Sequence, residues 1–189
     1  LNAQSMSFRE LLILAKDKEK LLASIPAIQP VRNKDLKKRI SGFGFRIDPI
    51  YKTRQKHTGM DFTADKGSDV YVTGDGVVEE IERKKWGYGN CIIVNHGYGY
   101  KTRYAHLSAV KVKVGQKLKR GELIGLVGST GKSTGPHLHY EVIENGKKIN
   151  SQKLKLPSGK ILKNKERKLF EVNKIKIDVL KSELIIGLN

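Results

Sequence analysis

Two short segments of this chain contain the residue types best suited to bind a metal ion. In residues 57–61 a histidine and a carboxylate, His57 and Asp61, are four positions apart, and in residues 137–139 two histidines, His137 and His139, are two apart. Even spacing places side chains on one face of a β-strand, so each pair could face one cation with modest local bending. Two imidazoles and one carboxylate form the three-ligand set of a catalytic zinc (Zn2+), with a fourth position for water. Zinc would lower the pKa of that water to about 7.

The joint pattern of histidines is more informative than any one of them. A lone histidine is more often a surface residue or a satisfied core residue than a ligand. Here four of the five histidines lie in or beside short Gly-rich strand segments with ligand-compatible spacing, and this favours a metal site. The fifth, His96, begins a turn with Gly97 and Gly99, and we interpret it as structural.

Two other motifs suggest chemistry that the surrounding sequence argues against. Residues 128–133 resemble a phosphate-binding loop, but Leu126 occupies the position of its first glycine. That loop also needs a following helix, whereas Gly135-Pro136 favours an extended chain. A helical His-Glu-x-x-His motif does not occur, so a thermolysin-like peptidase is not expected.

Composition narrows the class of partner without identifying it. The chain has 189 residues and a net charge of +18, which favours association with an anionic polymer such as nucleic acid, an acidic membrane surface or a carboxylate-rich cell wall. The basic residues are not interleaved with aromatic residues, so nucleic-acid binding is not expected. The single cysteine, Cys91, lies in an apolar run and predicts a buried thiol. No apolar run is long enough to span a membrane, and because the chain begins at Leu1 we interpret it as a fragment or mature form.

The pattern along the chain predicts a mainly β protein with two extensions. Residues 7–24 combine a capping box with helical spacing of apolar residues, and prolines then end the helix. Short apolar runs separated by glycine turns follow, which predicts an antiparallel β-sheet domain, and the Asn145-Gly146 pair predicts a hairpin. We therefore expect a helix and connector at 1–38, a β domain at 39–151 and an extension at 152–189. Within the extension we expect a helix near 164–181 and a strand near 183–186.

Several ordered blocks of the β domain resemble the lysostaphin/LytM-type zinc peptidases. The matching blocks are residues 41–46, 57–62, 74–78, 88–90, 104–107, 115–118 and 128–142. The resemblance implies the antiparallel LytM-type fold and a zinc site. It implies that His57, Asp61 and His139 are the zinc ligands, and that His106 and His137 are the two catalytic histidines that do not bind the metal.

Two further features depend on the same resemblance. Tyr51 lies where some family members place a tyrosine that stabilises an oxyanion, although an exposed turn tyrosine is an equally simple interpretation. Family members commonly have a proline after Asn150, where this chain has Ser151. The helix and the C-terminal extension lie outside the shared domain, and we expect them to form a homo- or hetero-oligomer interface or, alternatively, to cover the active-site groove.

The function implied by the resemblance is hydrolysis of peptide crosslinks in bacterial peptidoglycan. The segment around Arg46 and the upstream helix are more similar to periplasmic members than to secreted lysins. This favours a D-alanyl–diaminopimelate crosslink, a role in wall remodelling or cell shape, and a membrane anchor upstream of Leu1. The alternative is a non-catalytic regulator of another wall hydrolase. Regulators of that kind lack metal ligands or catalytic histidines, whereas this chain has the expected residue at all five of these positions.

Overall fold

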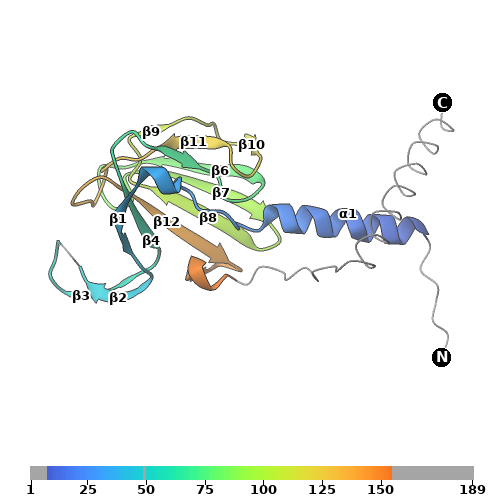
Figure 1. Cartoon of the computed structure of the whole chain (residues 1–189), viewed down its shortest axis with the longest axis horizontal. Coiled ribbons are helices and arrows are strands. Elements are labelled where there is room, and N and C mark those ends of the chain that lie inside the picture. The colour runs from blue at the N-terminus through green and yellow to red at the C-terminus, as the bar shows by residue number, and fades with distance from the viewer. Residues whose placement is uncertain (1–7, 49, 155–189) are drawn as a thin grey trace. The chain divides into compact units, whose positions relative to one another are not determined.

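The computed structural model describes residues 8–48 and 50–154 of the chain. The chain divides into two units, Leu1–Leu156 and Pro157–Asn189. The second unit, with the predicted helix near 164–181 and strand near 183–186, lies outside the described residues. The elements (Figure 1) are, in chain order, α1 (Phe8–Ser24), the 3-10 turn η1 (Asn33–Asp35), β1 (Leu36–Ser41), β2 (Gly44–Ile47), β3 (Arg54–His57), β4 (Met60–Ala64), β5 (Asp69–Tyr71), β6 (Gly76–Arg83), β7 (Asn90–Gly97), β8 (Tyr100–Ala105), β9 (Ala109–Val110), β10 (Lys117–Leu118), β11 (Leu123–Leu126), β12 (His137–Glu144), β13 (Lys147–Ile149) and the 3-10 turn η2 (Ser151–Lys153).

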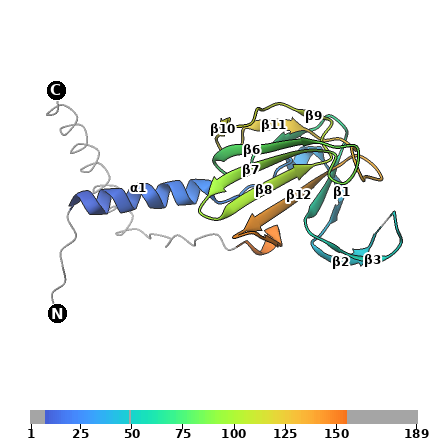
Figure 2. The same cartoon turned by 180° about the vertical axis from the view of Figure 1, so that it is seen from behind.

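The main structural element is an eight-stranded antiparallel sheet. Its strands follow the order β1-β4-β12-β8-β7-β6-β10, and β13 pairs with β12. The run from β12 through β8 and β7 to β6 can be followed in Figure 2. A three-stranded sheet, β5-β11-β9, and the separate hairpin β2-β3 complete the β structure. The predicted antiparallel β fold is therefore confirmed.

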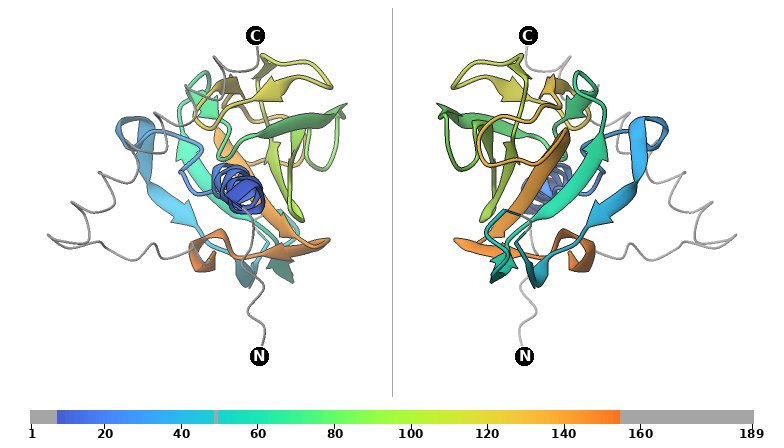
Figure 3. Two further views of the ribbon diagram at one scale, coloured as in Figure 1. Left: turned by 90° about the vertical axis from the view of Figure 1, so that its right-hand side faces the viewer. Right: turned by 90° about the vertical axis from the view of Figure 1, so that its left-hand side faces the viewer.

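Alternating side chains give the main sheet two different faces. On β12, Leu138 and Tyr140 belong to the large core, which also contains residues of the three-stranded sheet such as Val70 and Ile124. The intervening residues point the other way, toward the cleft described below. Figure 3 views α1 end-on and shows β12 (orange) beside β4 (teal), the pair of strands that matters most for the site. Because Leu138 and Tyr140 are buried in the core, the residues between them on β12 must point to the opposite face of the sheet.

Helix α1 agrees with the helix predicted at 7–24, and its C-terminal end is tied to the β domain by hydrogen bonds. The guanidinium of Arg120 donates to the backbone carbonyls of Leu22, Ala23 and Ile25. These carbonyls lie at the helix end, where helical partners are lacking. No helix in the described part of the chain has the length and apolar character needed to cross a membrane.

The predicted hairpin after β12 is also present. Asn145 and Gly146 both have positive φ, 49° and 78°, as a tight turn between β12 and β13 requires. Other short elements differ from expectation. Strand β9 has only two residues, too few to show a periodic pattern, and the polar hairpin β2-β3 has no alternating apolar pattern that would have indicated it.

Candidate metal centre

The segment 57–61 forms the end of one strand, a tight turn and the start of another. His57 ends β3 and Asp61 is the second residue of β4, and Thr58 and Gly59 connect the two strands. The expectation that His57 and Asp61 share one face of a single strand was wrong, because the chain changes sheet at this point. The turn nevertheless brings both side chains to the same place, since His57 Nε2 is 3.0 Å from Asp61 Oδ1.

Strand β12 supplies the third donor by its register with β4. His139 is paired with Asp61 across the two strands, and Ala105, the residue before His106, is paired with His139 on the other side. His137 lies two residues earlier and therefore on the same face as His139. In consequence all four site histidines and Asp61 meet on one side of the sheet.

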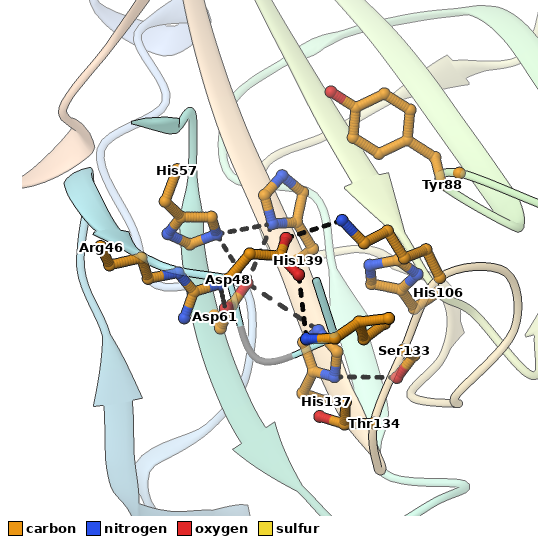
Figure 4. A pocket seen from close by; sticks show the side chains of 13 residues that line it. Arg46, Asp48, His57, Asp61, Tyr88, His106, Ser133, Thr134, His137 and His139 are labelled. Atoms are coloured by element: carbon orange, nitrogen blue, oxygen red, sulfur yellow. Dashed lines mark hydrogen bonds and ion pairs between the residues drawn. The ribbon is translucent and has the colours of Figure 1, made fainter. Parts of the chain in front are cut away.

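Three donor atoms form a compact triangle at this point. His139 Nδ1 lies 2.9 Å from Asp61 Oδ1 and 3.1 Å from His57 Nε2, and the rings of both histidines turn toward Asp61 in Figure 4. Ligand atoms of a tetrahedral zinc, with bonds of about 2.0–2.1 Å, are separated by roughly 3.3 Å. The three residues thus fit a metal ion by donor type and by spacing.

Each of the three donors is oriented by another group. His57 Nδ1 donates to the carbonyl of Gly42 over 2.8 Å, which leaves its Nε2 without a proton and facing the other donors. The second oxygen of Asp61, Oδ2, accepts from Arg46 at 2.7 Å. His139 Nε2 lies 3.2 Å from Glu141 Oε1. Groups of this kind orient metal ligands in proteins.

The electrostatics of the site favour the form of Asp61 that binds cations. Burial alone would raise the pKa of Asp61, but the neighbouring His139 and His57 rings outweigh it and hold this pKa well below its usual value. Asp61 is therefore a carboxylate at neutral pH. A carboxylate that is both buried and ionised is a suitable ligand for a divalent metal.

His106 and His137 lie beside the triangle with their rings 4.7 Å apart. His106 Nδ1 is 2.7 Å from the carbonyl of Thr130 and His137 Nδ1 is 2.8 Å from that of Gly135. With each Nδ1 donating its proton to a carbonyl, each Nε2 keeps a lone pair. Burial, and then the neighbouring His137, lower the pKa of His106 to about 4, so His106 is a neutral base.

The backbone of His106 is also unusual, because its φ is 62°. Left-handed backbone is costly for residues other than glycine and is concentrated at functional sites. Here it turns the chain at the end of β8, so that the carbonyl of His106 accepts from Thr130 and its ring faces His137.

These residues line a cleft of about 260 Å³. It lies between the β2-β3 hairpin, the 128–136 loop and the 84–89 loop, and its lining residues are Arg46, Asp48, Ile50, His57, Asp61, Gly87, Tyr88, His106, Lys132, Ser133, Thr134, His137 and His139. At its rim Trp86 directly precedes Gly87 and is 82% exposed.

Tyr51 lies next to this cleft but is not among the residues that line it. The side chain is 62% exposed. Its backbone N–H donates to Asp48, and Lys132 Nζ lies 4.1 Å from the centre of its ring. Hydrogen bonds from Lys132 and Tyr51 lower the pKa of Asp48 to about 2, so an ion pair holds the hairpin tip that carries Tyr51.

Sequence reasoning missed three residues that shape the site. Arg46 contacts Asp61, and its position in the sequence indicates no such role. Glu141 contacts His139 and continues the alternation that places His137 and His139 on one face, so the sequence did contain a signal for it. Gly59 was not considered, and a Cβ there would lie 2.5 Å from the carbonyl oxygen of Tyr140 and 2.8 Å from the His139 ring. His96, by contrast, is bonded to the carbonyl of Asp75 and to Thr102 away from the cleft, in keeping with a structural role.

The fold and the histidine–aspartate–histidine triangle together define a β-sheet protein with a cleft that could hold a metal ion. Comparison with known proteins then identifies the family to which the chain belongs. The model of Peptidase family M23 matches residues 55–151, so the chain belongs to this family. The expected relationship to lysostaphin/LytM-type peptidases is confirmed at the level of the family.

Curated relatives of similar sequence carry related names. The chain is 43% identical over 144 residues to the DD-carboxypeptidase/endopeptidase Mpg of Neisseria meningitidis, covering 76% of this chain and 33% of that protein. It is 42% identical over 133 residues to the peptidoglycan DD-endopeptidase ShyA of Vibrio cholerae, covering 70% and 31%. The chain thus spans about a third of the length of these relatives.

Solved structures agree with the observed fold. A zinc-containing peptidase from Vibrio cholerae is 41% identical, with a TM-score of 0.61 over 68% of this chain and 39% of that one. The catalytic domain of lysostaphin from Staphylococcus simulans is 33% identical, with a TM-score of 0.56 over 63% of this chain and 91% of that one.

Proposed function

We propose that this chain carries the catalytic domain of a zinc-dependent endopeptidase that hydrolyses peptide crosslinks in bacterial peptidoglycan. The observation that supports it most is the convergence of His57, Asp61 and His139 beside two further histidines with free Nε2 atoms. A metal site alone would be compatible with a structural ion. Two histidines with an Nε2 lone pair next to it could carry out the proton transfers that hydrolysis of an amide bond requires.

The proposed roles follow from the position of each group. His57, Asp61 and His139 would hold zinc, which supplies Lewis-acid polarisation and lowers the pKa of water to about 7. His106 and His137 accept a proton at Nε2 and return it to the leaving amine, because their Nδ1 atoms already donate to carbonyls. Tyr51, on the hairpin tip next to the cleft, would donate a hydrogen bond to the developing oxyanion.

The proposed substrate and location rest on relatives and charge. Two relatives are named for DD-endopeptidase or endopeptidase activity, one of them on peptidoglycan. We therefore assign the D-alanyl–diaminopimelate crosslink as substrate, the periplasm as location, and wall remodelling or cell-shape determination as role. The net charge of +18 suits the carboxylates of such a wall. A membrane anchor upstream of Leu1 and an oligomer formed through the two extensions remain part of this proposal.

The test is digestion of purified sacculi by the zinc-loaded protein, followed by mass analysis of the released muropeptides. Crosslinked dimers should be converted to monomers, with the new termini identifying the bond. The His57→Ala variant serves as the inactive control. If the protein carries full zinc and releases nothing, the non-catalytic regulator becomes the better proposal. Cleavage that persists in His57→Ala would refute the assigned site.

A further inference from the structure

Glu141 is a charged residue with no solvent exposure at all, and it lies two residues from a proposed metal ligand. It sits on β12 on the same face as His139, and its side chain is 0% exposed. Burying a carboxylate is expensive unless it is paired and hydrogen-bonded. The hydrogen-bond partners of Glu141 therefore indicate what this buried carboxylate does.

The carboxylate of Glu141 receives hydrogen bonds from several directions. Oε2 accepts from Arg103 at 3.0 Å. Oε1 accepts from Lys148 at 2.9 Å and from the hydroxyl of Tyr88 at 2.9 Å, and the hydroxyl of Thr58 donates to it as well. The positive charges of Arg103 and Lys148 already compensate the negative charge of Glu141. Charge balance alone thus does not explain the additional contact of Oε1 with His139.

That contact has a chemical consequence because imidazole has two tautomers. A neutral ring carries its proton either on Nδ1 or on Nε2, and only the nitrogen without the proton can bind a metal. His139 Nε2 lies 3.2 Å from Glu141 Oε1, while Nδ1 faces Asp61 Oδ1 at 2.9 Å. An ionised carboxylate can only accept hydrogen bonds. A cation bound by Asp61 and Nδ1 would leave no proton on Nδ1, and Glu141 can then accept the proton on Nε2.

We propose that Glu141 is a positioning residue that holds the proton of His139 on Nε2, so that Nδ1 stays available as a metal ligand beside His57 and Asp61. This inference rests on the proposed metal site, though not on the reaction catalysed there. Arg103, Lys148, Tyr88 and Thr58 then serve to fix the carboxylate in place. Removal of an outer partner of this kind typically weakens metal affinity by about 10- to 100-fold.

The first test measures zinc affinity by competition with a chromophoric chelator at fixed pH. Glu141→Gln should weaken affinity about 10- to 100-fold, because its amide can also donate to Nε2 and so stabilise the wrong tautomer. Glu144→Gln is the control, because it makes the same chemical change on the same strand, where the carboxylate accepts from Tyr100. It should bind zinc within a few-fold of the parent protein, and a loss equal to that of Glu141→Gln would overturn the proposal. Lys148→Met removes one group that holds the carboxylate but leaves the contact with His139, so its loss of affinity should be smaller than that of Glu141→Gln.

The second test observes the tautomer directly by nitrogen NMR of the histidine rings in zinc-loaded protein, because without the metal the Asp61 carboxylate, 2.9 Å from Nδ1, would compete for the same proton. His139 should carry its proton on Nε2 in the parent protein and in Lys148→Met, and should show a mixture or the reverse in Glu141→Gln. If Glu141→Gln does not fold, the double variant Glu141→Gln/Lys148→Met is used in its place, because it removes both charges of this ion pair and leaves no unpaired buried charge from it. An unchanged tautomer together with unchanged zinc affinity would refute the proposal. Because neither measurement uses turnover, a chain inactive on sacculi would still support or refute this role.

Discussion

At the scale of single residues, Asp61 is the point on which the candidate centre converges. Its Oδ1 lies within 3.0 Å of donor atoms on both His57 and His139, and its Oδ2 accepts from Arg46. Oδ1 also lies 3.9 Å from His137 Nε2, the longest of these distances. This difference supports treating His57 and His139 as ligands and His137 as a base.

Removal of a ligand should remove the metal. We expect about one zinc per chain in the parent protein and almost none in His57→Ala, because two remaining donors do not make a zinc site. Metal analysis of the purified proteins checks this directly. The double variant Asp61→Ala/His139→Ala provides the stricter case, and full zinc occupancy in it would show that the ligands are other residues.

Removal of a base should leave the metal in place. His106→Ala and His137→Ala should each retain zinc but lose on the order of 10²-fold or more in turnover on sacculi, the usual contribution of a proton-transfer group. Zinc content and muropeptide release are measured on the same preparations. Should either variant lose its zinc while His139→Ala keeps it, the roles of ligand and base would have to be exchanged.

At the scale of elements, β12 connects the hydrophobic core to the site. Leu138, Tyr140 and Val142 pack into the core, while His139 and Glu141 face the other side. Rotation of this strand is therefore opposed by the whole core. The same strand passes closely behind the turn at Gly59, so the turn and the strand must fit each other.

Substitution of that glycine should displace a ligand. In Gly59→Ala the new Cβ would lie 2.5 Å from the carbonyl oxygen of Tyr140 and 2.8 Å from the His139 ring, so β4 and β12 must shift. We expect zinc affinity to fall by at least about 10-fold, the scale seen when a ligand loses its orientation. Gly97→Ala is the control, because a Cβ at Gly97 would meet no neighbouring atom. The φ of Gly97 is 75°, so this substitution should lower the stability of the fold by about 1–2 kcal/mol without changing zinc affinity. Equal zinc affinity in both variants would contradict the prediction.

The burial of Cys91 in strand β7 predicts that its thiol is unreactive. Cys91 is buried in β7, and desolvation raises its pKa to about 12 from an ordinary 9.0. Since the thiolate is the reactive form, alkylation at pH 8 should be on the order of 10³-fold slower in native than in urea-unfolded protein. The raised pKa also contributes stability that is present below pH 9.0 and is lost as the pH rises toward 12. Rapid alkylation of the native protein would show that β7 opens readily.

Much of the fold could be predicted from the sequence, and so could the four histidines and the aspartate that meet in the cleft. The helix, the strand with His137 and His139, and the Asn145-Gly146 hairpin have strong local signals of periodicity and turn chemistry. The β2-β3 hairpin could not be predicted because Arg54, Gln55 and Lys56 are all exposed, and no buried face imposes a pattern. Contacts between distant segments, such as Arg46 with Asp61, depend on tertiary structure and leave no local signal.

At the scale of the whole molecule, charge is the dominant property. The net charge of +18 is spread over a chain that spans about a third of its curated relatives, so this unit brings its own attraction to an anionic polymer. Ion pairs such as Lys132 with Asp48 do not reduce this excess, because the net charge already counts both partners.

Binding to sacculi should therefore depend on salt. Exposed charges are screened over about 10 Å at 0.1 M salt, so affinity should fall several-fold between low and physiological ionic strength. The inactive His57→Ala variant separates binding from cleavage in a sedimentation assay. Affinity that is indifferent to salt would mean that the positive charge serves another purpose.

The chain contains a single tryptophan, Trp86, and it is 82% exposed directly beside Gly87 at the rim of the cleft. All indole fluorescence of this protein thus arises from one position next to the candidate site. A ligand that fills the cleft and extends over the 84–89 loop would move that indole out of water and shift its emission toward the blue. The protein therefore carries its own optical probe, with which occupancy can be titrated without a label and without waiting for turnover.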